Sequence, residues 1–488
     1  MESESRKIIS LPRIMIAAGS SGSGKTLITC ALLQLLHERF RDLYAYKCGP
    51  DYIDPMFHKK VLGVESENLD SFFCEQEDLC RILCRNGKGH AVIEGVMGIY
   101  DGISPAGTEA SCYEVAKLTG TPVVLVMDAS GTGRTVISQI KGILADDEDG
   151  CIRGLILNRI SPGFYERIKG VLERELQAAG FSRVQILGGI PFVKDIAFES
   201  RHLGLLLPDE IEDLKGRIER FSGVLCERID TETVLGIMES AKELMPENGQ
   251  EEDACMTAKD RMLSQGKPAY EHTLRDNGPV LAVAYDEAFC FYYRENLDLL
   301  QRAGLTIRYF SPLHDPHIPE DAAGLLLGGG YPELHLDALS NNHSMLSSIR
   351  QALDEHMPSI AECGGFMYLH RSVADRDGKG YALVGAVPGT CTYTGHAVRF
   401  GYLSLQADHG KAFDFDLSGM RGHEFHYYDS TCNGDLCKAV NPFKEKSHPC
   451  MMGDGSFLWG FPHLYYASRR DFAKAFAAKV MAFHDSRH

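Results

Sequence analysis

The first half of the chain alternates runs of apolar residues with segments in which apolar residues recur at helical spacing. The runs RIMIAA, AVIEG, PVVLVMD and IRGLILN are short and almost wholly apolar, as in strands that are buried on both faces. The segment GKTLITCALLQLLHERF follows the first run and spaces its apolar residues as a helix does. Strands that alternate with helices in this way predict an α/β fold with a doubly wound parallel sheet.

The pattern stops after Met245 and starts again beyond a polar segment. Residues 246–278 contain few apolar residues and several Gly and Pro residues, which is typical of a linker. The runs VLAVAY, LTIRYF, AGLLLGGG and PSIAEC then predict a second α/β series. A chain of 488 residues is also too long for one ordinary core. We therefore predict one domain over residues 1–245, a linker over residues 246–278 and a different α/β domain over residues 279–488.

Composition and charge narrow the range of partners. The formal net charge of -17 argues against non-specific binding to nucleic acid, which depends on Lys and Arg side chains that neutralise phosphates. No apolar run reaches the length of a membrane span, and the first ten residues, MESESRKIIS, lack the apolar stretch of a signal peptide. The fifteen cysteines are scattered and odd in number, which favours reduced thiols. We therefore expect no nucleic-acid partner, no membrane partner and a cytoplasmic location.

A phosphate-binding motif lies between the first strand and the first helix. The segment GSSGSGKT fits the pattern G-x-x-x-x-G-K-[ST] and contains Gly19, Gly22 and Gly24. These glycines allow backbone N–H groups to turn toward phosphate oxygens, and the following helix adds the positive end of its dipole. Lys25 is expected to reach the terminal phosphates, and the Thr26 hydroxyl to ligate Mg²⁺. The alternative is an ordinary glycine-rich turn, but the complete motif in this position favours a nucleotide site.

Four carboxylates and a lysine lie in two further segments of the first half. The segment YKCGPDYIDPMFH contains Lys47, Asp51 and Asp54, and VIEGVMGIYDG contains Glu94 and Asp101. Polar residues at the carboxyl ends of parallel strands face the ligand crevice of such a sheet. Oxygen ligands next to a nucleotide are suited to Mg²⁺. The alternative is that these acids are solvated loop charges or helix caps; their number beside a phosphate-binding loop favours a functional role.

Asn158 ends a further strand of the first domain, in the segment LILNRI. Its side-chain amide has the donor and the acceptor needed to pair with the edge of an adenine base. Asn is equally common as a turn residue after a strand. Both interpretations stay open on the sequence alone.

The segment PSIAECGGFMYL in the second half predicts a strand, a sharp turn and a helix, with Cys363 at the turn. A nucleophile in this position stands clear of its sheet, and the neighbouring glycines relieve steric crowding. The N-terminus of the following helix and a nearby histidine are expected to favour the thiolate. The alternative is a buried structural cysteine, which is the more common use of a free thiol.

Two other segments favour a catalytic role for this cysteine. A predicted strand ends in LLLGGGYPE, where the backbone N–H groups of Gly329 and Gly330 are candidates for an oxyanion hole. The segment GFPHLYY supplies His463 as a candidate base for Cys363. His463 is selected by its position and not by its residue type, because the chain has 19 histidines and many buried histidines have only a structural role.

Several motifs, taken in their order along the chain, resemble one known family. They are the phosphate-binding motif, KCGPDYIDPMFH, EGVMGIYDG, SRHLGL, LLLGGGYPELH, AECGGFMYL and GHEFHY. Together they are similar to the cobyrinic acid a,c-diamide synthases, glutamine-dependent enzymes of corrin biosynthesis. The resemblance covers nearly the whole chain except the predicted linker. It implies a dethiobiotin-synthetase-like ATP domain joined to a class I glutaminase-like domain.

The resemblance implies a reaction divided between two sites. Cys363 would attack the side-chain amide of glutamine and release ammonia, with His463 as the base. In the first domain, ATP with Mg²⁺ would phosphorylate a carboxylate of cobyrinic acid, and ammonia would displace the phosphate. The implied substrates are cobyrinic acid, L-glutamine and ATP, and the implied cofactor is Mg²⁺. A homodimer is one assembly that we consider.

The resemblance also gives roles to the polar residues of the first domain. Asp51, Asp54, Glu94 and Asp101 fall on acidic positions that serve magnesium, substrate or intermediate in the family. Among these, Asp51 and Glu94, together with Thr26, are the implied metal ligands. Lys25, Thr26 and Lys47 would stabilise phosphoryl charge.

The chain departs from the family's pattern at two positions. The catalytic histidine segment of the family resembles His-Leu-His-Phe, whereas this chain has Tyr465 in place of the second histidine. Cys48 stands where the family usually has valine, which is a small change in the size of an apolar side chain. In GHEFHY, the residues His423, Glu424 and His426 are assigned to the corrin-facing interface or to the fold, and not to catalysis.

Three alternatives remain on the sequence alone. The acceptor of the amide could be another tetrapyrrole, such as nickel-sirohydrochlorin or hydrogenobyrinic acid. The chain could be a partitioning-type P-loop ATPase, although such proteins carry an additional lysine early in the loop, where this chain has Ser20, and lack a glutaminase half. The third alternative is a scaffold whose glutaminase half is inactive.

Overall fold

The computed structural model describes residues 8–85, 89–196, 200–201, 204–205, 211, 213–245, 278–407, 410–443 and 446–487. The chain divides into two compact units, Met1–Thr257 and Ala258–His488. Except for Gly278, the predicted linker lies outside the described residues, as do the two central residues of the SRHLGL motif. Within the described part of the chain, no helix is long and apolar enough to cross a membrane.

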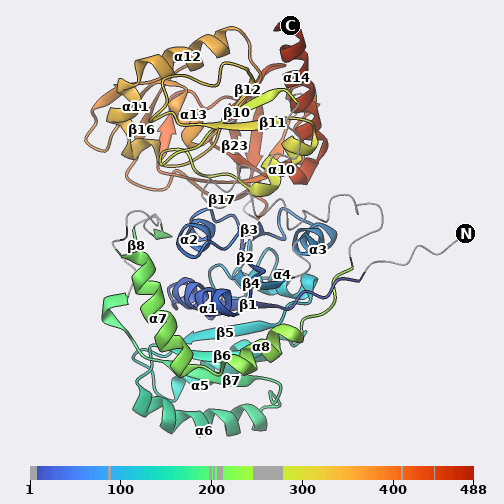
Figure 1. Cartoon of the computed structure of the whole chain (residues 1–488), viewed down its shortest axis with the longest axis vertical. Helices are drawn as coiled ribbons and strands as arrows, with labels where there is room; N and C mark the ends of the chain where they lie inside the picture. The colour runs from blue at the N-terminus through green and yellow to red at the C-terminus, as the bar shows by residue number, and fades with distance from the viewer. Residues whose placement is uncertain are drawn as a thin grey trace, which may run out of the picture. The chain divides into compact units, whose positions relative to one another are not determined.

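The first unit is built on a seven-stranded sheet in the order β3-β2-β4-β1-β5-β6-β7, and every strand pair in it is parallel (Figure 1). The strands are β1 Arg13–Ala18, β2 Leu43–Cys48, β3 Ser66–Leu69, β4 His90–Glu94, β5 Val123–Asp128, β6 Ile152–Asn158 and β7 Gln185–Ile190. Every residue of β1 and β2 is buried. The four strands predicted from apolar runs in this half are β1, β4, β5 and β6, and the doubly wound parallel sheet is confirmed.

Eight helices connect or follow these strands in the described part of this unit. They are α1 Lys25–Arg39, α2 Ile53–Leu62, α3 Gln76–Cys84, α4 Cys112–Thr119, α5 Thr135–Ala145, α6 Pro162–Ala178, α7 Leu214–Arg228 and α8 Thr231–Glu239. The chain between β7 and α7 contains the short 3-10 helix Lys194–Ile196 and the short strands β8 Ser200–Arg201 and β9 Gly204–Leu205. Apolar residues of α1, α2, α7 and α8 form one core with Ile14, Ile16 and Ala18 of β1. Alternate residues of a strand point to the same face, so these helices cover one face of the sheet.

The order of the strands places the candidate residues of this unit close together. β1 is the centre of the sheet, with β4 on one side and β5 on the other. Parallel strands have their carboxyl ends at the same edge, so the loops that follow β1, β2, β4 and β6 meet there. The phosphate-binding loop, the two acidic segments and Asn158 all belong to this edge.

The second unit has a central sheet of six strands in the order β11-β10-β12-β13-β25-β24. All its pairs are parallel except that between β24 and β25. These strands are β10 Val280–Ala284, β11 Thr306–Phe310, β12 Ala322–Leu327, β13 Ser359–Glu362, β24 Met452–Gly453 and β25 Phe457–Gly460. Alternate residues of β10 and β12 belong to two different apolar cores, so both faces of the sheet are covered. The four strands predicted in this half correspond to β10, β11, β12 and β13.

Helices and two further sheets surround this central sheet. The helices are α10 Arg294–Arg302, α11 Leu336–Asn341, α12 His343–Asp354, α13 Gly364–Tyr368 and α14 Asp471–Arg487, with 3-10 helices at Pro332–Leu334 and Tyr466–Arg469. One sheet has the order β15-β14-β16-β21, with β14 His370–Ala374, β15 Gly380–Ala382, β16 Val387–Tyr393 and β21 Tyr428–Ser430. The other has the order β23-β22-β17-β20-β26, with β17 Arg399–Gln406, β20 Arg421–His426, β22 Cys437–Val440, β23 Ser447–Cys450 and β26 His463–Leu464. A separate hairpin pairs β18 Lys411–Ala412 with β19 Phe415–Asp416. The apolar runs did not predict these short, mainly antiparallel strands.

Candidate functional site

The phosphate-binding loop takes a backbone conformation that favours glycine at two positions. Gly22 and Gly24 have φ values of 76° and 90°, in the left-handed region where a side chain is strained. Gly24 is also the residue before α1, so the N–H groups of the first helical turn face the loop. A Cβ atom on Gly19 would lie 3.0 Å from Sδ of Met127, which leaves little room for a larger residue.

Asn158 braces this loop. Its Nδ2 donates a hydrogen bond to the carbonyl oxygen of Ser23 at 2.9 Å, and its Oδ1 accepts one from the backbone N–H of Arg159 at 2.9 Å. A Cβ atom on Gly24 would overlap this amide. The contacts therefore give Asn158 a role in shaping the loop, which the sequence did not indicate, and its predicted pairing with adenine stays a prediction.

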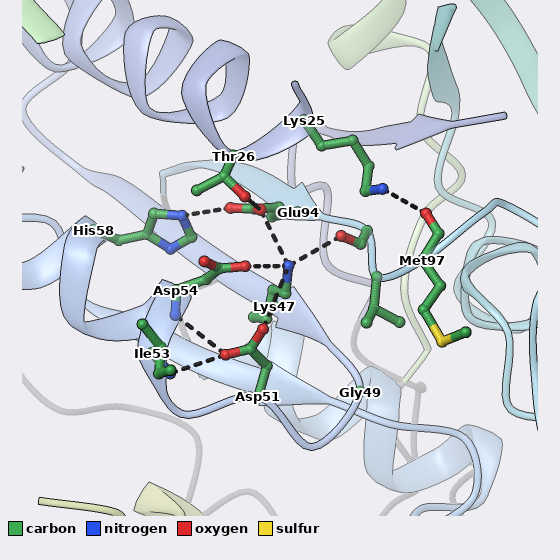
Figure 2. Close-up of polar contacts among 12 residues, drawn as sticks. Lys25, Thr26, Lys47, Gly49, Asp51, Ile53, Asp54, His58, Glu94 and Met97 are labelled. Carbon is green, nitrogen blue, oxygen red and sulfur yellow. Dashed lines mark hydrogen bonds and ion pairs between the residues drawn. The ribbon is translucent and has the colours of Figure 1, made fainter. Parts of the chain in front are cut away.

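Lys25 extends from the start of α1 toward the loop that follows β4. Its Nζ donates to the carbonyl oxygen of Met97 (Figure 2). The same Nζ lies 3.5 Å from the carbonyl oxygen of Ser20. Burial and the charge of Lys47 lower the pKa of Lys25. Asp101 belongs to the same loop, but it is exposed and its Oδ2 accepts from the backbone N–H of Gly98 at 2.8 Å. Asp101 thus shapes this loop and is not among the carboxylates that contact Lys47.

Those carboxylates form a cluster around the end of Lys47, which projects from β2. The Nζ of Lys47 contacts Asp54, lies 3.0 Å from Oε1 of Glu94 and 3.8 Å from Oδ2 of Asp51, and donates to the carbonyl oxygen of Gly95 at 3.0 Å (Figure 2). Asp51 also caps the start of α2, since its Oδ1 accepts from the N–H groups of Ile53 at 2.8 Å and Asp54 at 3.2 Å. The structure therefore brings Lys47, Asp51, Asp54 and Glu94 together.

Burial and mutual charge set the protonation of this cluster. Burial by itself would lower the pKa of Lys47. The negative charges of Asp54, Glu94 and Asp51 have the larger combined effect and raise it. Burial likewise opposes ionisation of Glu94, yet Lys47, followed by His58 and Thr26, lowers the pKa of Glu94 below its ordinary value. Burial and the neighbouring acids raise the pKa of Asp54. At neutral pH the cluster therefore holds a charged lysine and an ionised Glu94, while Asp54 retains its proton more readily.

Glu94 is held by two further side chains, one of which was missed from the sequence. The hydroxyl of Thr26 donates to Oε1 of Glu94 at 2.6 Å. Nε2 of His58 lies 3.0 Å from Oε2 of Glu94 (Figure 2). Nδ1 of His58 lies 3.0 Å from Oγ of Ser66. Because an ionised carboxylate only accepts, Nε2 is the donor to Glu94. Asp54 and His58 are four residues apart on α2 and therefore share one face of the helix, but this spacing does not indicate Glu94 as the partner of His58.

The donor set fits a magnesium ion that arrives with a nucleotide. Among the residues that the structure describes, no group of three or more His, Cys, Asp and Glu side chains is arranged to hold a metal ion. Mg²⁺ on a nucleotide needs fewer protein ligands, because phosphate oxygens and waters complete its octahedron. The Thr26 hydroxyl and the Glu94 carboxylate are adjacent oxygen donors at the phosphate-binding loop.

In the second unit, Cys363 stands at a strained corner between β13 and α13. Its φ of 47° and ψ of -105° are unfavourable for a residue with a side chain. The corner is fixed by hydrogen bonds from the N–H of Cys363 to the carbonyl oxygen of Gly460 and from the N–H of Gly365 to that of Gly328, both at 2.9 Å. A strained turn between strand and helix is the geometry of a nucleophile elbow.

The two predicted oxyanion glycines lie against this corner. A Cβ atom on Gly364 would be 3.1 Å from the backbone nitrogen of Gly330. A Cβ atom on Gly329 would overlap Cε1 of His463. The structure therefore gathers Cys363, Gly329, Gly330 and His463 in one place, although they come from three different segments.

Burial sets the protonation of the cysteine and the histidine. Burial, with a smaller contribution from Glu333, raises the pKa of the Cys363 thiol. Burial, followed by the charges of His423 and His426, lowers the pKa of His463 well below its ordinary value. The expected stabilisation of a thiolate is not found, because α13 has only five residues and only 7% of Cys363 is exposed. The resting pair is a neutral thiol and a neutral imidazole, and a neutral imidazole can take a proton when the thiol attacks.

Aromatic side chains surround His463. Its ring stacks on His423 with a centroid separation of 4.8 Å and an interplanar angle of 12°. Nδ1 of His423 lies 3.0 Å from the hydroxyl of Tyr293, whose ring meets that of Tyr465 edge to face at 5.2 Å. Tyr465, at the family's second histidine position, is thus a buried packing residue. Glu424 is next to His423 on β20 but contacts His448 at 3.0 Å.

We expect Gly329→Ala to lower glutamine hydrolysis by about 10-fold or more, because displacement of a catalytic group by about 1 Å can cost 100-fold. The new Cβ atom would push the imidazole of His463 away from the Cys363 corner. A matched control is Gly380→Ala, since no atom lies within 4 Å of a Cβ atom at that position. The measurement is the release of glutamate from glutamine by each purified variant. Equal rates for the two variants would show that glutamine hydrolysis does not depend on the space that Gly329 leaves for the His463 ring.

Comparisons with known proteins agree with the two units. Residues 14–205 match a family model described as the CobQ/CobB/MinD/ParA nucleotide binding domain. Residues 280–457 match one described as the CobB/CobQ-like glutamine amidotransferase domain. The cobyrinate a,c-diamide synthase of Caldanaerobacter subterraneus subsp. tengcongensis is 34% identical over 476 residues, which is 96% of this chain and 98% of that protein. That of Clostridium tetani is 35% identical over 475 residues, 96% of this chain and 99% of that protein.

Solved structures with low overall similarity were also found. A glutamine amidotransferase has a TM-score of 0.30 and 14% identity, and the match covers 42% of this chain and 99% of that one. The MinD cell division protein of Aquifex aeolicus has a TM-score of 0.26 and 13% identity, with 44% of this chain and 97% of that one covered.

Proposed function

Since the chain belongs to the family of cobyrinate a,c-diamide synthases, we propose that it converts the a and c acetate carboxylates of cobyrinic acid into amides, with glutamine as nitrogen donor and ATP as energy source. It is a glutamine-dependent, amide-forming ligase with a nucleotide-binding domain. The observation that carries the proposal is the presence of two sites in one chain. One is a phosphate-binding loop beside a lysine–carboxylate cluster. The other is a cysteine at a nucleophile elbow, with a histidine packed against the glycine that precedes Gly330.

The second unit would release ammonia from glutamine. The sulfur of Cys363 attacks the amide carbon of the glutamine side chain, while His463 takes the thiol proton. His463 then gives that proton to the departing ammonia, and water hydrolyses the thioester to glutamate. The N–H groups of Gly329 and Gly330 are the proposed donors to the oxyanion that forms on the amide oxygen.

The first unit would activate the carboxylate that accepts the ammonia. ATP transfers its γ-phosphoryl group to a carboxylate of cobyrinic acid, and ammonia then displaces phosphate from the acyl phosphate. Lys25 and Lys47 carry the positive charge that stabilises the transferring phosphoryl group. Thr26, Glu94 and Asp51 are the proposed ligands of Mg²⁺, which neutralises phosphate charge when it is bound.

We expect Asp51→Asn to lower amidation about 10-fold to 100-fold, because the substitution removes a negative charge 3.8 Å from Nζ of Lys47. Glutamine hydrolysis should not change, since Asp51 belongs to the first unit. Asp230→Asn is a matched control, because Asp230 also accepts from a backbone N–H and caps the helix α8. Amidation and glutaminase rates are measured for both variants. Unchanged amidation in Asp51→Asn would remove this residue from the site.

The proposed substrate is tested by supplying the purified protein with ATP, glutamine and one tetrapyrrole at a time. Cobyrinic acid, hydrogenobyrinic acid and nickel-sirohydrochlorin are compared, and the products are counted by mass as monoamides and diamides. The expected result is a diamide from cobyrinic acid at the highest kcat/KM. Failure to form any amide from cobyrinic acid, with turnover of another tetrapyrrole, would contradict the proposed substrate.

A further inference from the structure

A buried glutamate precedes the catalytic cysteine. Glu362 is the last residue of β13 and only 6% of it is exposed. Its Oε1 accepts hydrogen bonds from the backbone N–H of Leu464 at 3.4 Å and from the hydroxyl of Tyr466 at 3.2 Å. Leu464 directly follows His463 in the chain. The Glu362 carboxyl group is therefore hydrogen-bonded to the residue next to the proposed base.

The same peptide is held from its other side. Nδ2 of Asn296, on α10, donates to the carbonyl oxygen of Leu464 at 2.8 Å, and Oδ1 of Asn296 accepts from the N–H of Tyr466 at 2.8 Å. β26 also pairs with β20, where His463 is opposite His423. Leu464 thus has its N–H bound by Glu362 and its carbonyl bound by Asn296.

We propose that Glu362 is a positioning residue of the glutaminase reaction, which binds the peptide after His463 and thereby holds the imidazole against Gly329, beside the Cys363 corner. The inference rests on the proposed function, because it assigns a role within the glutamine-hydrolysing site. Glu362 itself need not touch the substrate. It acts through the backbone of β26.

The chemistry of the Glu362 carboxyl group supports a role as a hydrogen-bond acceptor and not as a negative charge. An isolated buried carboxylate is costly, and burial raises the pKa of Glu362 to about 8. At neutral pH the group is therefore mostly protonated, and the contacts described above use one oxygen as an acceptor. A glutamine side chain has the same shape and keeps that acceptor, so Glu362→Gln should preserve the contact whereas Glu362→Ala should not.

The test compares full-length Glu362→Ala, Glu362→Gln and Ser359→Ala. Ser359 is a matched control because its hydroxyl accepts from Nε1 of Trp459 at 3.1 Å, a buried hydrogen bond on the same strand. For each variant we measure kcat and KM for glutamine hydrolysis, amidation with ammonium as nitrogen donor, and the thermal midpoint. We expect Glu362→Ala to lower kcat about 100-fold with KM changed by less than about threefold and ammonium-dependent amidation retained. Glu362→Gln should stay within about fivefold of wild type, and Ser359→Ala should lower the thermal midpoint without lowering kcat.

Either of two outcomes with the Glu362 variants would overturn the inference. One is a kcat for Glu362→Ala equal to that of Ser359→Ala, and the other is Glu362→Gln as slow as Glu362→Ala. If Glu362→Ala does not fold, Tyr466→Phe decides, since it removes one of the two donors and should lower kcat several-fold; an unchanged kcat overturns the inference. A wild-type protein that does not hydrolyse glutamine would instead contradict the proposed function.

Discussion

Cys363→Ala is expected to lower glutamine-dependent amidation by more than about 10³-fold while amidation with an ammonium salt continues at the wild-type rate. The thiol is the proposed nucleophile, and its strained corner between β13 and α13 presents it for attack. Ammonium bypasses this step, because it supplies directly the nitrogen that glutamine hydrolysis would release. The measurement is the amide product formed with each nitrogen source under otherwise identical conditions.

A second buried thiol of the same unit is the control. Cys391 is free, is fully buried on β16 and belongs to an apolar core. Cys391→Ala also removes one thiol group, but at a site away from the Cys363 corner. It should leave both activities intact, at a modest cost in stability. Equal loss of glutamine-dependent and ammonium-dependent amidation in Cys363→Ala would contradict the separation of the two sites. Retained glutamine use would support a glutaminase half that employs another nucleophile.

Glu94→Gln is expected to lower amidation about 10³-fold with either nitrogen source and to leave glutamine hydrolysis in place. Glu94 is fully buried and accepts hydrogen bonds from Thr26, His58 and Lys47, so its negative charge holds these three side chains in place. A glutamine side chain has only one oxygen that accepts hydrogen bonds, whereas the carboxylate has two. It is also neutral, so the positive charge of the Lys47 ammonium group is compensated by one negative charge fewer. Amidation is measured at several Mg²⁺ concentrations, because loss of a metal ligand should also raise the concentration required.

Glu67→Gln is the matched control for this substitution. Glu67 lies on β3 of the same sheet, is 6% exposed, and its Oε2 is 3.4 Å from Nη1 of Arg85. Loss of this partly buried pair should reduce stability without changing the Mg²⁺ dependence of amidation. An amidation rate for Glu94→Gln close to that of Glu67→Gln would show that Glu94 is structural.

The parallel sheets of both units could be predicted from the sequence because their strands are buried on both faces. Strands such as β1 and β10 therefore appear as uninterrupted apolar runs, which periodicity detects. The strand β17, with the sequence RFGYLSLQ, mixes polar, aromatic and glycine residues and has several partly exposed positions. Its pairing with β20 and β22 depends on contacts distant in sequence, which no local pattern encodes.

Some residues of the candidate sites could likewise be predicted from the sequence, and others could not. The glycines of the phosphate-binding loop and the corner at Cys363 were predicted because backbone geometry demands particular residue types at fixed spacing. His58 and Glu362 were missed, since their importance comes from burial beside a partner that the chain brings from elsewhere. The protonation of Cys363 was predicted in the wrong direction, because the depth of burial cannot be obtained from a motif.

The coupling of ATP use to amide formation tests the central claim most directly. Purified protein is supplied with ATP, Mg²⁺, glutamine and cobyrinic acid, and ADP, glutamate and amide bonds are quantified in the same samples over time. A ligase that forms an acyl phosphate and consumes ammonia from glutamine should produce all three in equal amounts, and ADP formation should stop when cobyrinic acid is omitted. ADP that accumulates without new amide bonds, whether or not a tetrapyrrole is present, would contradict the proposal.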